Sequence, residues 1–423
     1  MAWLEHISHA EYDCCVIDQQ VRCTERKSTK PSIAAPCLFW SDHTPWQEAN
    51  LWAYLRITEQ AVDLQTVEAN LQALLHYANF LESEGLAWYE FPMRKSERCL
   101  VRYRGELVSA RNIGKLAPST VTTRMNHVVA FYRWVLEHNL LSIESTPWLD
   151  RQVTIRAFDG VGFKRSIQRT TTDLAIPNRK RSFGRVEGGL LPISADARNS
   201  VLEFAKLNAS EELFLMLSTG FFTGMRLGTI TDLKAKSLDH AVPDPAAPGL
   251  YRIAVGPGAS PPVHTKFGVT GQVWIPGKLL RLLQDYVNSP RHILRQAKAL
   301  PENKQHIFLT RFGNTYGRRG SEKSSAINVE ISSLRKTARR TKLKLIETFN
   351  FHQTRSTFGT ELARVAMQAG DEISALEFVR HALLHKDEQT TLKYIRFVQK
   401  TPIKHALMDE FTKFFSGLQG EMQ

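Results

Sequence analysis

The first third of the chain carries apolar residues at helical spacing. One stripe ends near Gly85, a suitable C-terminal stop, and a second begins near Ser119, a suitable N-terminal cap. Spacings of three and four residues place such side chains on one helix face, which packs against a neighbour. Residues 47–146 are therefore predicted to form a helical bundle. The two stripes are Val67, Leu71, Leu74, Ala78 and Leu81, and Val121, Met125, Val128, Tyr132 and Val135.

A second pattern begins at about residue 191. The runs "LYRIAVG", "PVHTKF" and "GQVWIPG" are separated by Gly and Pro and predict short strands. The segments "EELFLMLSTGFFTG" and "STFGTELARVAMQAG" predict helices instead. The chain is thus expected to be mainly α with a small antiparallel β-sheet, an α+β protein, with residues 191–400 as a second domain.

Three further segments lack the pattern of a domain. Residues 1–46, which contain several prolines, are predicted to be an irregular N-terminal extension. Residues 147–190 are rich in Lys and Arg and predict a basic interdomain linker, either laid along an anionic partner or merely exposed. Residues 401–423 predict a C-terminal helix whose apolar stripe must be buried. That stripe is Ile403, Leu407, Phe411, Phe414 and Leu418.

The charge balance narrows the choice of partner. The chain has 55 Lys and Arg against 42 Asp and Glu, a formal net charge of +13. A balance of this size favours a polyanion, with nucleic acid first and a membrane surface second. An ordinary basic protein is the alternative. No apolar run is long enough to span a bilayer, and the first residues do not form a secretory signal. We expect an intracellular, cytoplasmic protein associated with DNA.

The cysteines do not predict a metal site. Four of the five lie in the first 37 residues, but no CxxC pair occurs among them. Zinc sites usually contain regularly spaced ligand pairs. We therefore expect reduced, partly buried thiols, and no metal or cofactor. The cysteines are Cys14, Cys15, Cys23, Cys37 and Cys99.

Two cationic residues stand out in the second domain. Arg226 follows a Thr-Gly break in "FFTGMRLGTITDLK", where apolar residues flank it on both sides. A buried Arg requires an anion or several acceptors. Lys266 is expected at the end of a strand, in a glycine-containing hairpin whose tip can bring it toward a ligand. Taken alone, Lys266 would be read as a solvated hairpin residue.

A third cluster lies in "FNFHQTRSTFG". His352 and Arg355 are three residues apart and would share a helix face. The neighbouring Phe349, Phe351 and Phe358 indicate an apolar wall, so a second Arg again lies in an unusually apolar context. Farther along, His385 and Tyr394 are nine positions apart.

These residue types favour phosphate chemistry. Arginine grips phosphate with two parallel hydrogen bonds and stays charged at any working pH. Without a carboxylate cluster, the set does not build a divalent-metal site. Such cations can assist phosphoryl transfer in place of Mg²⁺. Tyr394 supplies a nucleophile whose phenol, with a pKa near ~10, needs a proton acceptor and a positive field. Lys266 is the natural general acid.

The order of these residues resembles the tyrosine recombinase, or phage integrase, family. "TGMRLGTITDLK" looks like that family's first box, "HTKFGVTGQVWIP" like its lysine hairpin, "HQTR" like its HxxR box and "LLHKDEQTTLKY" like its last box. The match spans residues 205 to 400, and the bundle at 47–146 resembles the family's DNA-clamping core-binding domain. The matching residues are Arg226, Lys266, His352, Arg355, His385 and Tyr394.

The resemblance implies a mechanism. Arg226 and Arg355 would hold the scissile phosphate, and His385 would bind it as well. Tyr394 would attack to form a 3′-phosphotyrosyl link, while Lys266 protonates the leaving 5′ oxygen. His352 would assist proton transfer. The ester conserves the bond energy, so a second 5′-hydroxyl can reseal the strand without nucleotide or metal.

The resemblance also implies partners. They are double-stranded DNA with specific recombination sites, a dimer on each site and a tetramer in the synapse. Accessory DNA-bending or directionality factors and a mobile genetic element are expected with them, and no membrane. The C-terminal helix would dock on a neighbouring protomer, unless it packs on its own domain. Expected DNA contacts are Arg124 and Arg133 in the bundle and Arg179, Lys180 and Arg181 in the linker.

The sequence departs from the family pattern at three places, one of which is the insert "DHAVPDPAAPG" before the strands, longer than a tight turn needs. Thr229 stands where an acidic residue is common, three positions after the first Arg. Leu384 stands where the last box usually has glycine, which makes His381 a rival of His385 with the wrong distance to Tyr394. Two other functions share the fold: site-specific DNA binding without strand transfer, and DNA relaxation by a topoisomerase of the same chemistry.

Overall fold

The computed structural model describes residues 1–401 apart from 10–11, 18–19, 26–32, 61, 144–145, 159–163, 179–185, 187–188 and 318–323. The chain divides into two compact units, one of Met1–Ala157 with Arg165–Arg181 and one of Phe158–Lys164 with Ser182–Gln423. The finer division into five segments stays a prediction. Apart from Thr401, the predicted C-terminal helix lies outside the described residues, as do Arg179, Lys180 and Arg181.

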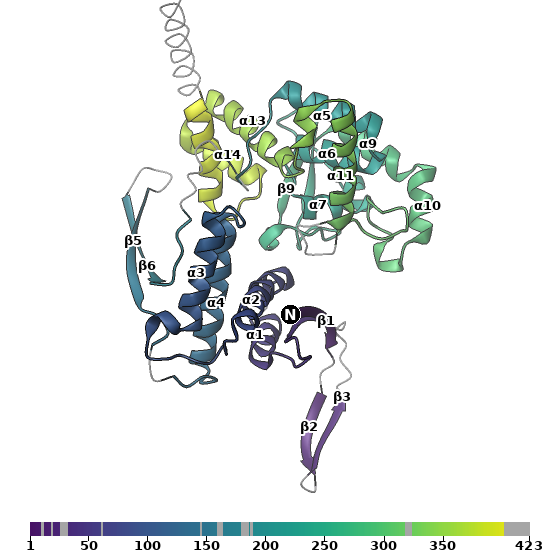
Figure 1. Ribbon diagram of the computed structural model, residues 1–423. Coiled ribbons are helices and arrows are strands. Elements are labelled where there is room, and N and C mark those ends of the chain that lie inside the picture. Colours follow the sequence, from purple (N-terminus) through teal and green to yellow (C-terminus); the bar gives the residue numbers. More distant parts are fainter. Residues whose placement is uncertain are drawn as a thin grey trace, which may run out of the picture. The chain divides into compact units, whose positions relative to one another are not determined.

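The first unit is built on four helices (Figure 1). They are α1 (Gln47–Thr58), α2 (Leu64–Glu84), α3 (Cys99–Asn112) and α4 (Pro118–Glu137), with the short 3₁₀ turn η1 (Lys95–Glu97) before α3. Both predicted apolar stripes are fully buried in one core, which confirms the helical periodicity. Gly85 ends α2 in the left-handed conformation, as predicted. The predicted cap at Ser119 is wrong, because α4 begins at Pro118 with Ala117 as its cap.

Residues 1–46 are not irregular, contrary to the prediction. Strand β1 (Trp3–His9) pairs antiparallel with β4 (Ile33–Phe39), and β2 (Tyr12–Ile17) pairs with β3 (Gln20–Glu25). Pro36 is tolerated because both strands of a two-stranded sheet are edges. The expectation of reduced cysteines also fails at Cys23, which is disulfide-bonded, whereas Cys15, Cys37 and Cys99 are free thiols.

The segment predicted as a linker contains a pair of strands as well. Strand β5 (Asp150–Phe158) and strand β6 (Lys164–Thr172) form a two-stranded sheet. Strand β5 alternates apolar residues at Val153, Ile155 and Ala157, whereas the sequence of β6 contains one apolar residue, Ile167. Those side chains of the pair that the structure describes are mostly exposed, and periodicity could not reveal β6.

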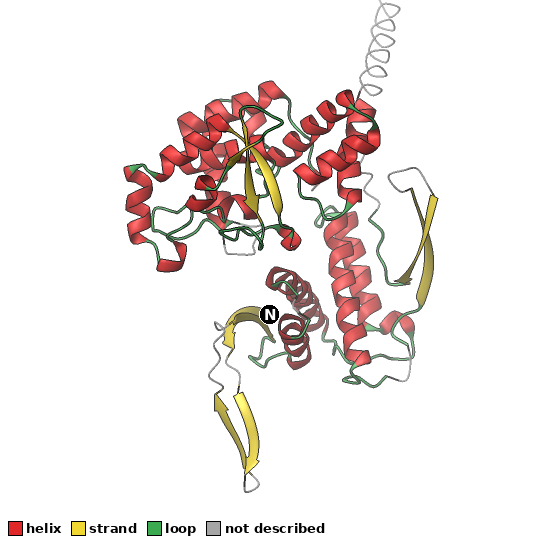
Figure 2. Ribbon diagram, turned by 180° about the vertical axis from the view of Figure 1, so that it is seen from behind, coloured by secondary structure: helices red, strands yellow, loops and turns green. Residues whose placement is uncertain are grey.

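The second unit is a set of helices around a three-stranded antiparallel sheet, shown in yellow in Figure 2. The sheet order is β7 (Val242–Pro243), β8 (Leu250–Val255) and β9 (Gly271–Pro276), and η3 (Lys266–Gly268) lies in the β8–β9 connection. The helices are α5 (Ala195–Asn208), α6 (Glu211–Thr223), α7 (Leu227–Thr231), α8 (Ala235–Asp239), α9 (Gly277–Val287), α10 (Pro290–Lys298), η4 (Pro301–Asn303), α11 (Ser325–Arg340), α12 (Lys344–Glu347), α13 (Gln353–Ala369), α14 (Glu372–Ala382) and a helix over 388–401.

Helix α6 is the centre of this unit, and nearly all of its side chains are buried. Gly220 of α6 lies against Thr354 of α13, where an added Cβ would lie 2.4 Å from the threonine Oγ1. The Thr354 side chain leaves no room for a Cβ at this position, so the position needs glycine. This contact brings the C-terminal end of α6 beside the first turn of α13, which are the two segments that carry Arg226 and Arg355.

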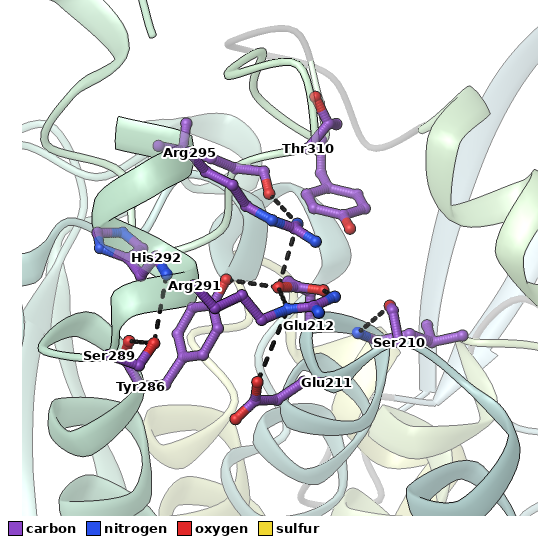
Figure 3. A network of polar contacts seen from close by, with 12 residues as sticks. Ser210, Glu211, Glu212, Tyr286, Ser289, Arg291, His292, Arg295 and Thr310 are labelled. Atoms are coloured by element: carbon purple, nitrogen blue, oxygen red, sulfur yellow. Dashed lines mark hydrogen bonds and ion pairs between the residues drawn. The ribbon is translucent and has the colours of Figure 1, made fainter. Parts of the chain in front are cut away.

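A buried carboxylate fixes the other end of α6 (Figure 3). Glu212 is fully buried and accepts hydrogen bonds from Arg291 and from the hydroxyl of Tyr286, with Arg295 3.1 Å away. Burial raises the pKa of Glu212, but the hydrogen bonds from Arg291 and Tyr286 outweigh it and lower that pKa. The charged network joins α6 to α9 and α10, so the helix that leads into the site is anchored at its start. Among the described helices, none is long and apolar enough to cross a membrane.

Candidate active site

Arg226 is placed by the turn that follows α6. Gly224 has φ 66° in the left-handed region, and Arg226 is the N-cap residue of α7. A Cβ on Gly224 would lie 2.4 Å from the Phe358 ring and 2.9 Å from the side chain of Leu383. The position thus requires glycine both for its backbone conformation and for its packing. Arg226 itself is half-buried rather than fully buried as predicted.

Arg355 joins two loops of the site. It lies in the first turn of α13 and is only 3% exposed. Its Nη1 donates to the carbonyl of Gly224 at 2.6 Å, and its Nη2 donates to the carbonyl of Leu383 at 2.9 Å. These two acceptors partly meet the need of a buried guanidinium for hydrogen bonds. The planar fork therefore fixes the turn before Arg226 relative to the loop before His385.

Lys266 lies in the connection between β8 and β9. The predicted hairpin is present, since β8 and β9 pair antiparallel, but the predicted strand "PVHTKF" is wrong. Only Val263 in it forms a bridge, with Gly256. The backbone N–H of Gly268 donates to the carbonyl of Thr265 at 3.0 Å, so Lys266 lies in a tight turn and is exposed.

One pocket brings three of the predicted residues together. Its lining includes Arg226, Lys266 and Arg355, and also Thr229 and Leu383. The three cations come from the α6–α7 turn, the β8–β9 connection and α13, which are far apart in the sequence. A pocket with three permanent or near-permanent positive charges favours an anion such as phosphate.

His385 is held by the end of α14. The N–H of Leu384 donates to the carbonyl of His381, and the N–H of His385 donates to the carbonyl of Arg380. This is a Schellman motif, which needs a left-handed residue after the helix, and Leu384 supplies it with φ 49°. The His385 side chain is buried and its Nδ1 lies 2.9 Å from the Thr391 hydroxyl.

Tyr394 lies in the helix over 388–401 and is 0% exposed. Its ring stacks on that of His385, with 5.8 Å between the centroids. On the α13 side it packs against Gly359, where an added Cβ would lie 2.6 Å from Tyr394 Cε1. Tyr394 and His385 are thus brought together, and Leu383 connects them through the chain to the pocket with the three cations.

The remaining predicted residues are placed less directly. His352 is the N-cap residue of α13, three positions before Arg355, and is half-buried, but it is not among the residues that line the pocket. His381, the rival of His385, is exposed at the end of α14. In the bundle, Arg133 pairs with Asp150 and lies over the Trp148 ring, whereas Arg124 is half-buried on α4.

Solved structures with a similar fold align with most of this chain. A Tn1549 transposon integrase in complex with circular intermediate DNA aligns with a TM-score of 0.50 at 13% identity, over 82% of this chain and 94% of that chain. The same integrase in complex with transposon right end DNA gives 0.49 at 13% identity, with the same coverage. A lambda integrase dimer bound to a COC′ core site gives 0.46 at 12% identity, again over 82% and 94%. No protein-family model matches the sequence, and no curated protein matches it.

The chain has the tyrosine-recombinase fold. The predicted class, mainly α with a small antiparallel sheet, is confirmed. At 13% identity the likeness concerns the fold, so the roles of individual residues stay predictions. Leu384, which stands where the resemblance leads us to expect glycine, adopts a left-handed conformation that glycine adopts without strain.

Sequence reasoning missed one residue that holds the candidate site in shape. Asp232 ends α7 and is buried, with its Oδ2 accepting from the backbone N–H of His264 at 2.6 Å, two residues before Lys266. Burial raises the pKa of Asp232, but hydrogen bonds, first from His306 and then from Lys234 and His264, lower it to about 2. Asp232 is thus charged and ties the helix capped by Arg226 to the lysine turn. Only its place in "TITDLK" could have pointed to it.

Proposed function

We propose that the chain is a site-specific DNA recombinase that cleaves and rejoins DNA strands through a 3′-phosphotyrosyl intermediate. The single observation that carries the proposal is the pocket in which Arg226, Lys266 and Arg355 converge. Its three cations suit a phosphodiester whose charge grows on its oxygens in the transition state. The loop of Leu383, which accepts a hydrogen bond from Arg355, leads directly to His385 and Tyr394.

The proposed reaction runs as follows. The Tyr394 oxygen bonds to the phosphorus while the bond from phosphorus to the 5′ oxygen breaks. The phenolic proton passes to His352, and Lys266 gives a proton to the leaving 5′ oxygen. Arg226, Arg355 and His385 hold the phosphate oxygens. A 5′-hydroxyl of another strand then reverses the steps, so the number of phosphodiester bonds is unchanged and no nucleotide is consumed.

The assembly and the biological role follow from the same proposal. One of the solved structures with a similar fold is the Tn1549 transposon integrase in complex with circular intermediate DNA. We place this chain with integrases or excisionases of mobile elements, acting as a dimer on each site and as a tetramer in the synapse. Accessory DNA-bending or directionality factors would assist, and the protein would be associated with the nucleoid in the cytoplasm.

A covalent adduct tests the proposal. Random-sequence duplexes with a nick that lets the released fragment, which carries the free 5′-hydroxyl, diffuse away would be incubated with the full chain. SDS-resistant DNA–protein adducts would then be recovered and sequenced. We expect an adduct at one preferred sequence, none with Tyr394→Phe, and a normal one with Tyr89→Phe, which alters an exposed tyrosine of the first unit. An adduct that survives Tyr394→Phe would contradict the assigned nucleophile.

Site-specific DNA binding without strand transfer is the second candidate. It is favoured by the complete burial of the Tyr394 side chain, since a nucleophile must reach its phosphate. Selective binding of one duplex by the wild type, with no adduct under any condition that preserves binding, would support this function. Relaxation of plasmids that lack the selected sequence would instead indicate a topoisomerase.

A further inference from the structure

Phe267 is an exposed aromatic residue at the edge of the cationic pocket. It follows Lys266 directly, and its side chain is 67% exposed. The Nζ of Lys266 lies 5.3 Å from the centroid of its ring, and the Nζ of Lys386, the residue after His385, lies 5.7 Å from it. The ring thus lies close to two ammonium groups that belong to two different loops of the site.

The backbone at Phe267 is strained. Its φ is 66°, in the left-handed region that bulky residues rarely adopt. Such a conformation persists only where the surrounding structure enforces it, and it is frequent at ligand-binding and active sites. Glycine or asparagine would fit this backbone conformation better. The conformation itself therefore does not explain why a phenylalanine occupies the position.

The turn that carries the ring is firmly held. The hydroxyl of Thr265 donates to the carbonyl of Val269 at 2.6 Å, and the N–H of Gly268 donates to the carbonyl of Thr265. On the other side of the connection, the N–H of His264 donates to Asp232. The ring is therefore presented to solvent by a rigid turn and contributes little to the core of its own unit.

The surroundings select the chemistry of the ligand. Two ammonium groups beside an exposed ring disfavour a cationic partner and favour a chain in which negative charges alternate with flat apolar groups. Nucleic acids have this character, and aromatic side chains in cationic grooves stack on bases. In a duplex, an apolar side chain can also wedge into a base step and open it.

We infer that Phe267 packs against a nucleobase next to the phosphate held in the pocket, with Lys266 at that phosphate and Lys386 on the adjoining backbone. This inference rests on the proposed function for the identity of the phosphate. Phe267 would thus help to recognise DNA at the cleavage position. A base step that opens easily would be preferred there.

The test uses a duplex that the full chain selects from a random-sequence pool, with 2-aminopurine placed in turn at each position around the adduct site. It is run in the Tyr394→Phe background, so that no cleavage is needed. We expect fluorescence to rise at one position on binding, because the opened step unstacks the probe. Phe267→Asn keeps a residue that tolerates the left-handed conformation and should abolish the rise. It should also weaken binding about fivefold to a hundredfold, as loss of one base–aromatic contact does.

Three comparisons make the test specific. Phe267→Tyr should keep the fluorescence rise. Lys386→Ala should weaken binding and lower the salt dependence by about one phosphate contact, whereas Phe267→Asn should leave the salt dependence unchanged. Phe312→Asn is the matched control, because Phe312 is 65% exposed and lies beside Arg311 in a separate loop. It should change neither the fluorescence nor the affinity.

The inference is overturned if Phe267→Asn binds within about twofold of its parent and keeps the fluorescence rise, since loss of a stacking contact costs more than that. It is also overturned if the variant binds DNA normally but changes the self-association of the protein, because a protein partner would then cover the ring. Melting curves of Phe267→Asn and Phe267→Gly verify that both fold. If the wild type forms no adduct while the fluorescence effect persists, only the proposed strand transfer fails. If no duplex is selected, both proposals fail.

Discussion

The ring of Tyr394 stacks on the ring of His385, with 26° between the two planes. Gly359 of α13 also packs against the Tyr394 ring, and the tyrosine side chain is fully buried. If Tyr394 is the nucleophile, it must leave this position before it attacks a phosphate. The buried arrangement is then a resting state, and the energy that holds the ring in place adds to the barrier for cleavage.

We expect Gly359→Ala to weaken this resting state. The new methyl carbon would lie 2.6 Å from Tyr394 Cε1 and 2.9 Å from Leu383 Cδ1, so the helix over 388–401 must shift. Hydrogen exchange of that helix should become faster. The covalent adduct should form about tenfold faster for each 1.4 kcal/mol of docking energy lost. Gly105→Ala in α3, where the new methyl meets no atom within 4 Å, is the control. Slower adduct formation would show that Gly359 supports the reactive geometry instead.

Arg355→Lys should slow cleavage and lower stability together. A lysine cannot donate to the carbonyls of Gly224 and Leu383 at once, and an unsatisfied buried acceptor costs about 1–3 kcal/mol in the free energy of unfolding. Cleavage should fall by about 10²–10³, the usual effect of losing one transition-state donor, and Arg226→Lys should do the same. The control is Arg335→Lys, because Arg335 also grips a backbone carbonyl, that of Phe349. Arg335→Lys should lower stability without slowing cleavage. If Arg335→Lys slows cleavage as much as Arg355→Lys does, the role of Arg355 is purely structural.

The Asp232 carboxylate should contribute to stability above about pH 4. Its pKa is lowered from 3.8 to about 2 in the folded chain, so the charged form is favoured by folding. The contribution, about 2 kcal/mol, is complete above the unfolded pKa and is lost as pH falls through the folded pKa. Urea unfolding should show Asp232→Asn to be less stable than the wild type at pH 7, with a gap that narrows between about pH 4 and 2. The exposed Asp285→Asn should show no such gap.

Cleavage and resealing should persist in EDTA and without nucleotide. The proposed site relies on Arg226, Lys266 and Arg355 for the charge that a metal ion would otherwise supply. In the part of the chain that the structure describes, no three His, Cys, Asp or Glu residues are grouped as metal ligands. The measurement is adduct formation and religation after dialysis against chelator. A strict requirement for Mg²⁺ would point to a different set of catalytic groups.

The sequence was informative wherever one local rule decides the structure. The stripes through Leu71 and Val128 follow helical spacing, and both are buried as predicted. The strands of residues 1–46 were missed because neither "WLEHISH" nor "IAAPCLF" alternates cleanly, and Pro36 argues against a strand in any sheet but a narrow one.

In the predicted site, too, some features can be read from the local sequence and others cannot. The order of the cationic residues and Tyr394 is visible in the sequence, and three of the cations do line one pocket. The burial of Tyr394 was not predictable, because it depends on Gly359, 35 positions earlier, having no side chain. The role of Asp232 was hidden for a similar reason, since its partners His264 and His306 are distant in sequence. Contacts between remote segments are set by tertiary packing, which no local pattern reports.

The left-handed conformation of Leu384 has a mechanical consequence. Leucine at φ 49° stores strain of about 1–2 kcal/mol that glycine would not. The residue is the joint between α14 and the segment that carries His385 and Tyr394. We expect that rotation of Leu384 to negative φ would release this strain and reorient the segment that follows. Leu384→Gly removes the strain and should therefore make that rotation less favourable, even though glycine is the more flexible residue.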